Sequence, residues 1–477
     1  MLNLSKIRQE LDNKKISCHE LTKIYLKNIK EYDSKINSYI TVCEEFAYKS
    51  AKKAQERIDK KESLNMTGIP ISIKDNICTK GIKTTAASKM LADFMPVYNA
   101  TAVNKLVFED AVILGKTNLD EFGMGDSNQH SFFGPARNPY NAEYITGGSS
   151  GGAAASVAAN LAPAALGTDT GGSVRQPAAL CGVTGIRPTY GTVSRFGLIA
   201  FASSLDQIGV CAKSAHDVGY VLNSIYGIDE KDSTTSKKST GNYLSLIDKI
   251  QKNLKIGISA EFINKITDED VKKSILSVID YFKYNGAEII EVSLPSSEYG
   301  IGAYLAISSA EASTNLSKFD GIKYGYFDSD INKARTQAFG KEVKKRILLG
   351  NYVLSAENFD KCFNAAKNVQ QKLIDEYTQM FEKCDVLISP TTLSAARKIN
   401  SPGNNLKPDY SQDMFTVSAS LVGLPEITTT CGYNHDNLPI GFSITGKPYH
   451  EAQIIAIADM FEKDFKRKEP ILWNSFR

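Results

Sequence analysis

The chain has few of the residues that mark specialised classes of protein. Its 477 residues include 8 cysteines, 5 histidines and 1 tryptophan. No two cysteines lie close enough in sequence to form a CxxC zinc or redox motif. Scattered single cysteines in a long chain are typical of a reduced intracellular enzyme. We therefore expect a cytoplasmic protein with neither a metal site nor a disulfide framework.

The chain also lacks a large excess of charge of either sign. It carries 56 Lys and Arg residues against 53 Asp and Glu residues, a formal net charge of +3 at pH 7. A protein that holds nucleic acid by its own electrostatic attraction needs a stronger positive balance. Any role on a nucleic acid is therefore expected to come through a partner.

No long hydrophobic run is present. The most apolar stretch, residues 153–167, is interrupted by Asn160 and Pro163 and is too short to cross a bilayer. The first fifteen residues include Glu10 and Asp12 and contain no apolar segment of the kind that signal peptides have. We therefore expect neither a membrane anchor nor a secretion signal.

Strand-like and helical patterns alternate along the chain. Ile69, Ile71 and Ile73 alternate with other residues, which predicts a half-buried strand that ends near Lys74. Further strand-like runs are expected at residues 111–119, 255–259, 287–295, 384–392, 424–432 and 438–446. Such alternation favours an α/β fold, with a central mixed β-sheet that is covered by helices on both faces.

We expect a single domain over residues 1–477, and no internal repeat is visible. Helices are expected to fill residues 1–62, and the core of the domain to span residues 63–225. A helical insertion within the same domain is predicted for residues 300–380. The composition, 42% hydrophobic and 23% charged, is that of an ordinary globular protein.

Three segments concentrate the chemistry: ISIKDN around Lys74, TGGSSGG from Thr146, and GTDTGGSVRQPAALCGVTGIRPTYG from Gly167. A phosphate cradle would need GxxxxGK[ST], or GxGxxG at the start of a helix. GGSSGG is not followed by lysine, and TGGS is followed by Val174 and Arg175. A flexible linker would not be flanked by alanine-rich helices and apolar strands. A nucleophile site is the remaining interpretation.

A serine hydroxyl in such a site needs a base to take its proton. No histidine lies in the three segments and no GxSxG elbow occurs in them, although members of a Ser-His-Asp triad can meet from anywhere in a fold. A lysine serves as the base if burial keeps it neutral. Lys74 has apolar neighbours that suit this role, while the alternative for a lysine at a strand end is a solvated surface charge.

The three segments resemble, almost residue by residue, the hallmark of the amidase signature family. The resemblance implies a Ser–cis-Ser–Lys triad. In it Ser173 is the nucleophile, Ser149 is the relay that follows a cis peptide bond, and Lys74 is the base. Such an enzyme cleaves amide bonds through an acyl-enzyme.

The tetrahedral oxyanion of this reaction needs preorganised hydrogen-bond donors. The backbone N–H groups of Thr170, Gly171 and Gly172 are expected to supply them, because glycine allows a close approach to the substrate. Asp169 and Arg175 are expected to hold the loop in shape rather than to take part in the reaction.

Other segments, among them KTNLDEFGMG, resemble the A subunits of the aminoacyl-tRNA amidotransferases within that family, and FDGIKYGY and EVKKRILLG are the most telling of them. The resemblance implies a glutaminase that hydrolyses free glutamine. It places Asp413 against the α-ammonium group, and Arg346 with Tyr304 against the α-carboxylate. For Arg346 the alternative is a solvated charge on a basic helix, and for Asp413 it is a helix N-cap.

The resemblance also implies a heterotrimer with B and C subunits. Ammonia would pass to the B subunit, which would bind ATP, magnesium and Glu-tRNA(Gln) or Asp-tRNA(Asn), so that this chain needs no cofactor. Residues 125–131 (GDSNQHS) depart from the usual pattern beside the expected pocket. Two other functions stay open: a stand-alone amidase of small or aryl amides, and a binding module without enzymatic activity.

Overall fold

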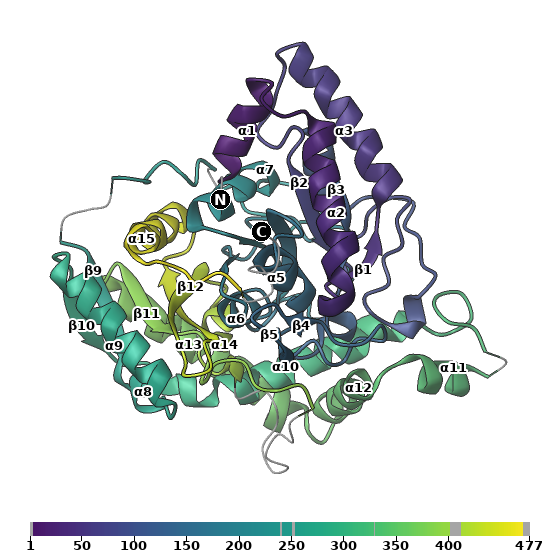
Figure 1. The fold of residues 1–477 in the computed structure, drawn as a ribbon. Helices are drawn as coiled ribbons and strands as arrows, with labels where there is room; N and C mark the ends of the chain where they lie inside the picture. The colour runs from purple at the N-terminus through teal and green to yellow at the C-terminus, as the bar shows by residue number, and fades with distance from the viewer. Residues whose placement is uncertain (1–2, 239–240, 250–252, 329, 401–411, 471–477) are drawn as a thin grey trace.

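A computed structural model describes residues 3–238, 241–249, 253–328, 330–400 and 412–470 (Figure 1). Its centre is a mixed β-sheet that has 11 strands in the described residues, in the order β1-β3-β2-β6-β8-β7-β12-β13-β11-β9-β10. The strands of this sheet are β1 (Tyr39–Val42), β2 (Pro70–Lys74), β3 (Val112–Thr117), β6 (Ala164–Asp169), β7 (Thr184–Arg187), β8 (Gln207–Ala212), β9 (Lys255–Ser259), β10 (Glu288–Val292), β11 (Val386–Pro390), β12 (Glu426–Tyr433) and β13 (Pro439–Gly446). A separate hairpin pairs β4 (Arg137–Asn138) with β5 (Asn141–Ile145).

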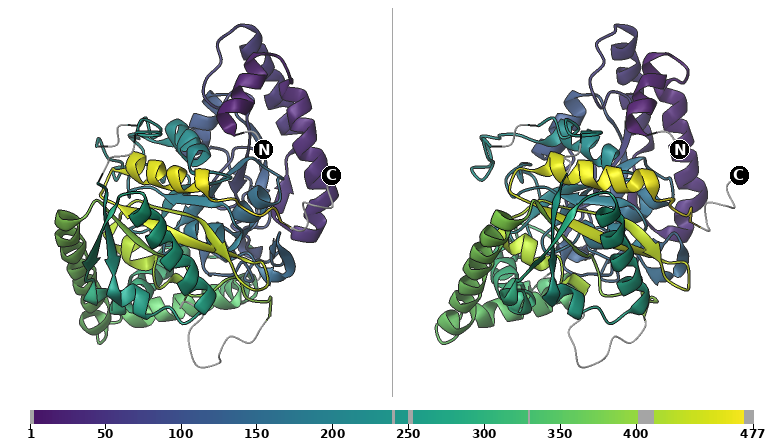
Figure 2. Two further views of the ribbon diagram at one scale, coloured as in Figure 1. Left: turned by 60° about the vertical axis from the view of Figure 1, so that its left-hand side comes forward. Right: turned by 90° about the vertical axis from the view of Figure 1, so that its left-hand side faces the viewer.

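Helices surround this sheet. They are α1 (Leu4–Asp12), α2 (Cys18–Ile36), α3 (Glu44–Asp59), α4 (Thr101–Phe108), α5 (Gly151–Ala158), α6 (Arg175–Leu180), α7 (Ala215–Ile225), α8 (Ala260–Asn264), α9 (Glu269–Tyr284), α10 (Gly300–Asn315), α11 (Ile331–Ala338), α12 (Lys341–Leu354), α13 (Ala365–Lys383), α14 (Val417–Val422) and α15 (Glu451–Asp464). The purple helices α1–α3 project from one end of the molecule, and α15, in yellow, lies lengthwise over the sheet (Figures 1 and 2).

Strand β13 shows why both faces of the sheet are covered. Successive residues of a strand point to opposite faces. A Cβ added at Gly441 would lie 2.5 Å from the Cβ of Ala179 in α6. The ring of the next residue, Phe442, packs instead against Phe282 of α9 and Phe461 of α15. The predicted mixed sheet between two helical layers is therefore confirmed.

The prediction of a half-buried strand around Ile71 is wrong in one respect. All five residues of β2 are buried, including the polar Ser72 and Lys74. Strand β2 is fully buried because it lies between β3 and β6 in the sheet and because helices α2 and α5 contact it. The Ser72 hydroxyl is hydrogen-bonded to the hydroxyl of Tyr39, the first residue of β1 in the same sheet.

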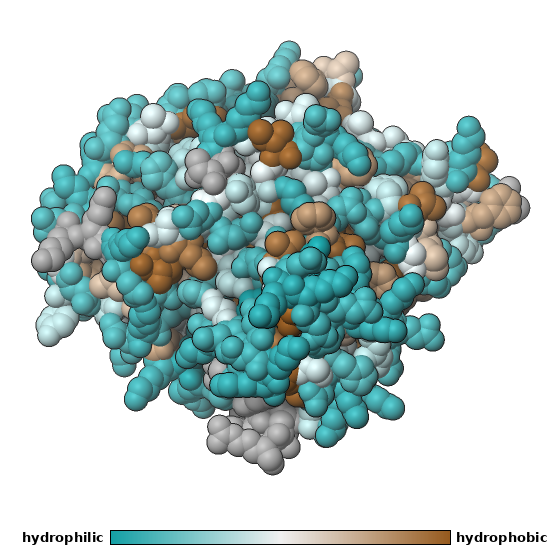
Figure 3. Space-filling view, turned by 90° about the horizontal axis from the view of Figure 1, so that it is seen from above, coloured by the Kyte–Doolittle hydropathy of each residue, from teal (hydrophilic) through white to brown (hydrophobic). Residues whose placement is uncertain are grey.

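The N-terminal helices have the sequence signals that such helices need. Ser17 and Glu20 form a capping box at the start of α2, which satisfies backbone N–H groups of its first turn. In α1, Leu4, Ile7 and Leu11 are buried, as their shared face predicts. The face seen from above in Figure 1 is mainly hydrophilic, with apolar residues in small separate patches (Figure 3). Across the described ranges, no helix has both the length and the apolar character that crossing a bilayer requires.

Helices α10 and α12 make a close contact that depends on a glycine. A Cβ added at Gly350 of α12 would lie 2.0 Å from the carbonyl oxygen of Ser309 in α10. Helix α10 also contacts α13 and α14, so this contact ties residues 300–383 to the rest of the domain. The side chains that α10 and α12 carry toward the interior therefore depend on the glycine.

We expect Gly350→Ala to lower the free energy of unfolding by about 1–3 kcal/mol, because the added methyl group must push α10 and α12 apart. Gly302→Ala, in α10, is the matched control, since an added Cβ there meets no atom within 4 Å. The control should raise the free energy of unfolding by up to about 1 kcal/mol through helix propensity. Urea unfolding of both variants measures the difference, and equal effects would contradict the packing argument.

Candidate active site

The ammonium group of Lys74 lies at the buried end of β2. Its Nζ is 2.8 Å from each of three hydroxyl oxygens: those of Ser149, Ser150 and Thr168. The carbonyl oxygen of Thr168 is a further acceptor at 3.3 Å. Lys74 is fully buried. The alternative of a solvated surface lysine is therefore wrong.

Burial lowers the pKa of Lys74 to about 7, and the nearby carboxylates of Asp120, Asp169 and Asp206 offset only part of this effect. Nowhere in the described chain does a carboxylate form an ion pair with Lys74. Hydroxyl groups stabilise a buried ammonium group less than a carboxylate would. A large share of the Lys74 side chains is therefore neutral at neutral pH, and neutral Nζ can accept a proton.

Ser149 reaches Lys74 from the loop before α5. The Gly148–Ser149 peptide bond is cis, and the Gly148 N–H donates a hydrogen bond of 2.8 Å to the Gln176 side chain. A Cβ added at Gly148 would lie 2.1 Å from a carboxylate oxygen of Asp120. Only glycine fits there, so the carboxylate of Asp120 sets the path of the chain into Ser149.

The same carboxylate organises residues 125–131, the segment that departs from the family pattern. Asp120 accepts hydrogen bonds from the backbone N–H groups of Ser127, Asn128 and His130 at 3.3, 2.8 and 3.0 Å. The Asn128 side chain in turn accepts one from the Gly152 N–H at 3.1 Å. The departing residues thus lie behind Ser149 and support its loop.

Ser173 lies on the loop between β6 and α6. Its carbonyl oxygen accepts a hydrogen bond of 3.0 Å from the Ser150 N–H, which joins the two serine-bearing loops. In the parts of the chain that are described, the hydroxyls of Ser149 and Ser173 do not hydrogen-bond to each other. The structure therefore brings Lys74 and Ser149 into contact and holds Ser173 beside them through the backbone. Catalytic hydrogen bonds are often looser without substrate.

The loop before Ser173 presents unpaired donors. The backbone N–H groups of Thr170, Gly171 and Gly172 donate no hydrogen bond to any other described residue. The loop is held instead by its other groups. The Thr170 hydroxyl donates to Asp206 at 2.7 Å, and the Gly171 carbonyl accepts from the Thr416 hydroxyl at 2.6 Å. Donors left free in a fixed loop are what an oxyanion requires.

A buried ion-pair cluster anchors this loop to the sheet. Asp169 accepts from Arg175 at 2.8 Å and lies 3.4 Å from Arg187, while Arg175 also bonds Glu426 at 2.6 Å. Burial alone would raise the pKa of Asp169, but the two arginines hold that pKa well below its usual range. Asp169 also accepts from the Val174 N–H at 3.0 Å. Its contacts are those of a residue that shapes the loop, as expected.

Tyr304 and Asp413 meet the loop at its two glycines. A Cβ added at Gly171 would lie 2.7 Å from the Tyr304 ring. One added at Gly172, which has a φ of +152°, would lie 3.1 Å from an oxygen of Asp413. The Arg346 guanidinium lies 5.9 Å from the centre of the Tyr304 ring. The structure therefore brings the three expected glutamine-binding residues to one side of the loop.

Arg346 is 1% exposed, so the alternative of a solvated charge is wrong. Its Nε donates to Glu342 at 3.0 Å, and one of its terminal nitrogens donates to the Ser308 hydroxyl at 3.2 Å. The Arg346 guanidinium thus lies inside the domain, on the interior side of α12.

The alternative for Asp413 is also wrong. Helix α14 begins at Val417, and the residue before it, Thr416, is its N-cap, without a side-chain capping bond. One carboxylate oxygen of Asp413 is buried and has no hydrogen-bond partner among the described residues. Burial and then the charge of Asp169 raise the pKa of Asp413 to about 7. A cation placed beside it would satisfy the oxygen and lower that pKa.

Sequence reasoning missed Ser150 and Thr168 as partners of Lys74. Ser150 is the immediate neighbour of Ser149, and Thr168 lies on β6, which pairs in parallel with β2 through Ile73 and Leu166. In that register Thr168 lies two residues beyond the partner of Ile73, so the register brings it near Lys74 but does not by itself predict the contact. No group of three or more His, Cys, Asp or Glu side chains suited to a metal ion occurs in the described part of the chain.

Known proteins resemble this chain in sequence and in fold. The profile of the family described as Amidase matches residues 20–455. The A subunit of the glutamyl-tRNA(Gln) amidotransferase from Ruminiclostridium cellulolyticum is 47% identical over 475 residues, which cover 98% of each chain. That of Caldanaerobacter subterraneus is 46% identical over 98% of this chain and 96% of its own. The crystal structure of its counterpart from Thermotoga maritima has a TM-score of 0.79 and 36% identity, and covers 95% of this chain and 93% of its own.

The buried Lys74 predicts a pH-dependent stability. Between its folded pKa of about 7 and its ordinary value of 10.5, the unfolded chain holds a proton that the folded chain lacks. The Lys74 contribution to the free energy of unfolding therefore rises with pH in this window, by up to about 1.4 kcal/mol per pH unit. Lys74→Met should remove this slope, whereas Lys23→Met, at an exposed site, should keep it. Urea unfolding at several pH values tests this, and equal slopes in both variants would contradict a neutral buried lysine.

Proposed function

Because this chain belongs to the amidase family, we propose that it is the glutamine-hydrolysing subunit of a tRNA-dependent amidotransferase. In that complex Glu-tRNA(Gln), Asp-tRNA(Asn) or both are converted to Gln-tRNA(Gln) and Asn-tRNA(Asn). The observation that carries the proposal is Lys74, which is buried, has no counter-ion among the described residues and lies 2.8 Å from the Ser149 hydroxyl. The 47% identity to a chain of that name, over 98% of the length, supports the choice within the family.

The proposed reaction begins with two proton transfers. Neutral Lys74 takes the proton of the Ser149 hydroxyl, and Ser149 takes the proton of the Ser173 hydroxyl as its oxygen attacks the side-chain amide carbon of glutamine. The C–O bond forms while the carbonyl π electrons move onto oxygen. The free N–H groups of Thr170, Gly171 and Gly172 donate to this oxyanion.

Collapse of the tetrahedral intermediate breaks the C–N bond. The relay returns a proton to the leaving nitrogen, so that ammonia departs and a γ-glutamyl ester of Ser173 remains. A water molecule then attacks the ester carbon while Ser149 and Lys74 take its proton. The C–O bond to Ser173 breaks, the relay returns the proton to the Ser173 oxygen, and glutamate is released. Burial protects the ester from other nucleophiles, since Ser173 is only 6% exposed.

The residues around the two glycines would hold the amino-acid end of glutamine. The unpaired oxygen of Asp413 suits the α-ammonium group, and Arg346 suits the α-carboxylate. Burial raises the pKa of Tyr304, so that its hydroxyl remains a hydrogen-bond donor at neutral pH. A cation site and an anion site on one side of the loop favour a zwitterionic amino acid over a simple amide.

The resemblance to the family also implies how the complex is assembled. B and C subunits complete a heterotrimer, and the B subunit binds ATP, magnesium and the charged tRNA, while this chain carries no cofactor. The net charge of +3 accords with a chain that leaves tRNA binding to its partner. We expect the complex in the cytoplasm, where protein synthesis takes place.

A stand-alone amidase would share the same triad, so the two functions differ in what surrounds it. Such an enzyme needs no charged pair for an amino-acid end, whereas this chain buries both Arg346 and Asp413. A binding module without activity would gain nothing from a lysine buried without a counter-ion, which costs folding free energy.

Ser173→Ala should abolish glutamine-dependent formation of amidated tRNA, since the nucleophilic oxygen is lost. Activity with an added ammonium salt should remain, because ammonia then reaches the partner subunit directly. The measurement is amidation of charged tRNA by the complete complex with each nitrogen source. Cys43→Ala, at a partly buried thiol outside the site, is a control that should keep both activities. Loss of both activities in the Ser173 variant would contradict the proposed division of labour.

Asp413→Asn should raise the KM for glutamine about tenfold to a hundredfold, because one charge-assisted hydrogen bond to the ammonium group is lost. In the wild type, glutamine affinity should increase as the pH rises through about 7, where the Asp413 carboxyl loses its proton. The variant should lose this dependence of KM. Asp436→Asn, at an exposed position, is the control. An unchanged KM in the Asp413 variant would favour the stand-alone amidase.

A further inference from the structure

A buried carboxylate beside the site joins two of its loops. Asp206 directly precedes β8 and is 3% exposed. One of its oxygens accepts a hydrogen bond from the Thr170 hydroxyl at 2.7 Å. The other accepts hydrogen bonds from the backbone N–H groups of Phe201 and Ala202 at 2.9 and 3.0 Å. Asp206 therefore connects the loop of the expected oxyanion donors with residues 198–206, which we call the Phe201 loop.

On one side, Asp206 fixes the residue that carries an oxyanion donor. Arg187, at the end of β7, fastens the same two segments a second time. Its guanidinium donates to the carbonyl oxygen of Asp169 and, at 2.8 Å, to that of Leu205. The backbone N–H of Thr170 lies in this fastened stretch and donates to no other described residue. With its hydroxyl held as well, Thr170 keeps a fixed orientation, which is what a preorganised donor needs.

On the other side, Asp206 holds a ring that contacts Arg346. The guanidinium carbon of Arg346 lies 5.7 Å from the centre of the Phe201 ring and 5.9 Å from that of the Tyr304 ring. A guanidinium group at this distance from an aromatic ring is attracted to it. Both Phe201 and Arg346 are buried. The place of the guanidinium group therefore depends on the place of the Phe201 ring.

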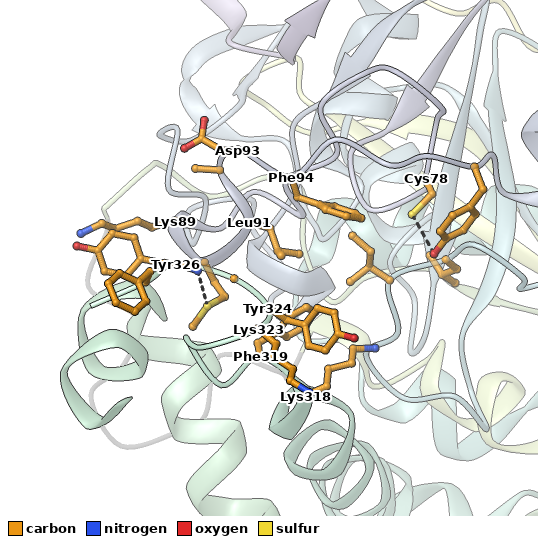
Figure 4. Close-up of a pocket in the computed structure, with 17 residues that line it drawn as sticks. Cys78, Lys89, Leu91, Asp93, Phe94, Lys318, Phe319, Lys323, Tyr324 and Tyr326 are labelled. Carbon is orange, nitrogen blue, oxygen red and sulfur yellow. Dashed lines mark hydrogen bonds between the residues drawn. The ribbon is translucent and has the colours of Figure 1, made fainter. Parts of the chain in front are cut away.

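The Phe201 loop borders an open space, so hydrogen bonds hold it there. Its residues Leu198 and Ile199 line a cavity of about 780 Å³, whose opposite wall includes residues 318–327 (Figure 4). Toward α10, the side-chain amide of Asn315 donates to the carbonyl oxygen of Phe201 at 3.1 Å. The buried carboxylate accepts the N–H groups at the same point of the loop. Loss of that carboxylate would leave the loop free to shift toward the cavity.

A carboxylate is the group that suits this place. Three donors from two loops converge on Asp206, and a carboxylate accepts on both of its oxygens, whereas an amide accepts on one. Burial raises the pKa of Asp206 to about 6, although its hydrogen bonds act in the opposite direction. Most Asp206 side chains are therefore ionised at neutral pH, and both oxygens can accept.

We propose that Asp206 is a positioning residue for glutamine hydrolysis, which directs an oxyanion donor through Thr170 and places the Arg346 guanidinium through Phe201. The inference rests on the proposed function, which supplies the substrate. A donor to the oxyanion acts in the transition state and affects kcat, whereas a contact with the amino-acid end acts in both states and affects KM. The two connections of Asp206 should therefore separate in the kinetics.

The first test breaks each connection by itself, in the complete complex of this chain with its B and C subunits. Thr170→Val removes the hydroxyl and keeps the backbone N–H, so it should lower kcat for glutamine hydrolysis about tenfold to a hundredfold and leave KM within about twofold. Phe201→Leu removes the ring, so it should raise KM about threefold to thirtyfold and leave kcat within about twofold. An unchanged kcat in the first variant, or an unchanged KM in the second, would overturn the proposal.

The second test changes the carboxylate. Asp206→Ala should lower kcat and raise KM together. In Asp206→Asn the amide oxygen must face the N–H groups of Phe201 and Ala202, which cannot reverse, and the NH₂ group faces the Thr170 hydroxyl. The Asn variant should therefore recover the wild-type KM but only part of kcat. Equal KM values in the Ala and Asn variants would contradict the proposed contact with the Phe201 loop.

The control is Asp217→Asn, at a buried carboxylate of α7 that accepts the Leu4 N–H at 2.7 Å. It should leave both kinetic constants unchanged. Amidation of charged tRNA with an ammonium salt bypasses the glutamine site, so it should keep its wild-type rate in each variant and show that the complex is intact. The Thr170 and Phe201 variants decide the question even if the Asp206→Ala complex does not form.

The wild-type complex separates the two levels of the argument. If it does not hydrolyse glutamine, the proposed function fails, and this inference fails with it. If it hydrolyses glutamine while the Thr170, Phe201 and Asp206 variants behave like the Asp217 control, the proposed function stands and the positioning role of Asp206 alone is wrong.

Discussion

The structure depends on the amino group of Lys74, which is kept from water and has no counter-ion in the described part of the chain. Lys74 is fully buried, and hydroxyl and carbonyl oxygens of Ser149, Ser150 and Thr168 are its partners. A carboxylate at the same distance would keep the lysine charged and useless as a base. The fold therefore has to hold Asp120, Asp169 and Asp206 nearby while it gives each of them other partners. Asp120 accepts backbone N–H groups, Asp169 binds arginines and Asp206 binds the Thr170 hydroxyl.

Those carboxylates also shape the loops that the site needs. Asp169 with its arginines fastens the loop before Ser173 to β12 through Glu426, and Asp120 leaves room only for glycine at position 148. Each charge is buried, so removal of a single partner would leave an uncompensated ion inside the domain. The shape of the loops and the ionisation of Lys74 thus have a common physical origin.

The amino-acid sequence predicts the fold class well, because strand-like and helical runs alternate clearly and each is long enough to recognise. It misjudges β2, since a single strand does not reveal that it will lie between β3 and β6 with helices over it. The Gly/Ser-rich motifs lead to Lys74, Ser149 and Ser173, whose roles stay predictions. Tyr304 could be predicted only from the resemblance to the family. Nothing in the sequence places it near Gly171, and only the folded chain shows its ring against that residue. Ser150 lies on the loop before α5 and Thr168 follows the paired part of β6, so the sequence pattern does not predict the contact of either with Lys74.

The ion pair between Arg175 and Glu426 has a consequence for synthesis of the protein on the ribosome. The 251 residues that separate its members mean that the loop before Ser173 emerges long before its anchor. Strand β7 likewise waits for β12, its antiparallel neighbour on one side, with one edge unpaired. A nascent chain that ends before β12 thus presents an open sheet edge, a target for chaperones and for aggregation. It also cannot hydrolyse its substrate prematurely, because its catalytic loop is not yet held.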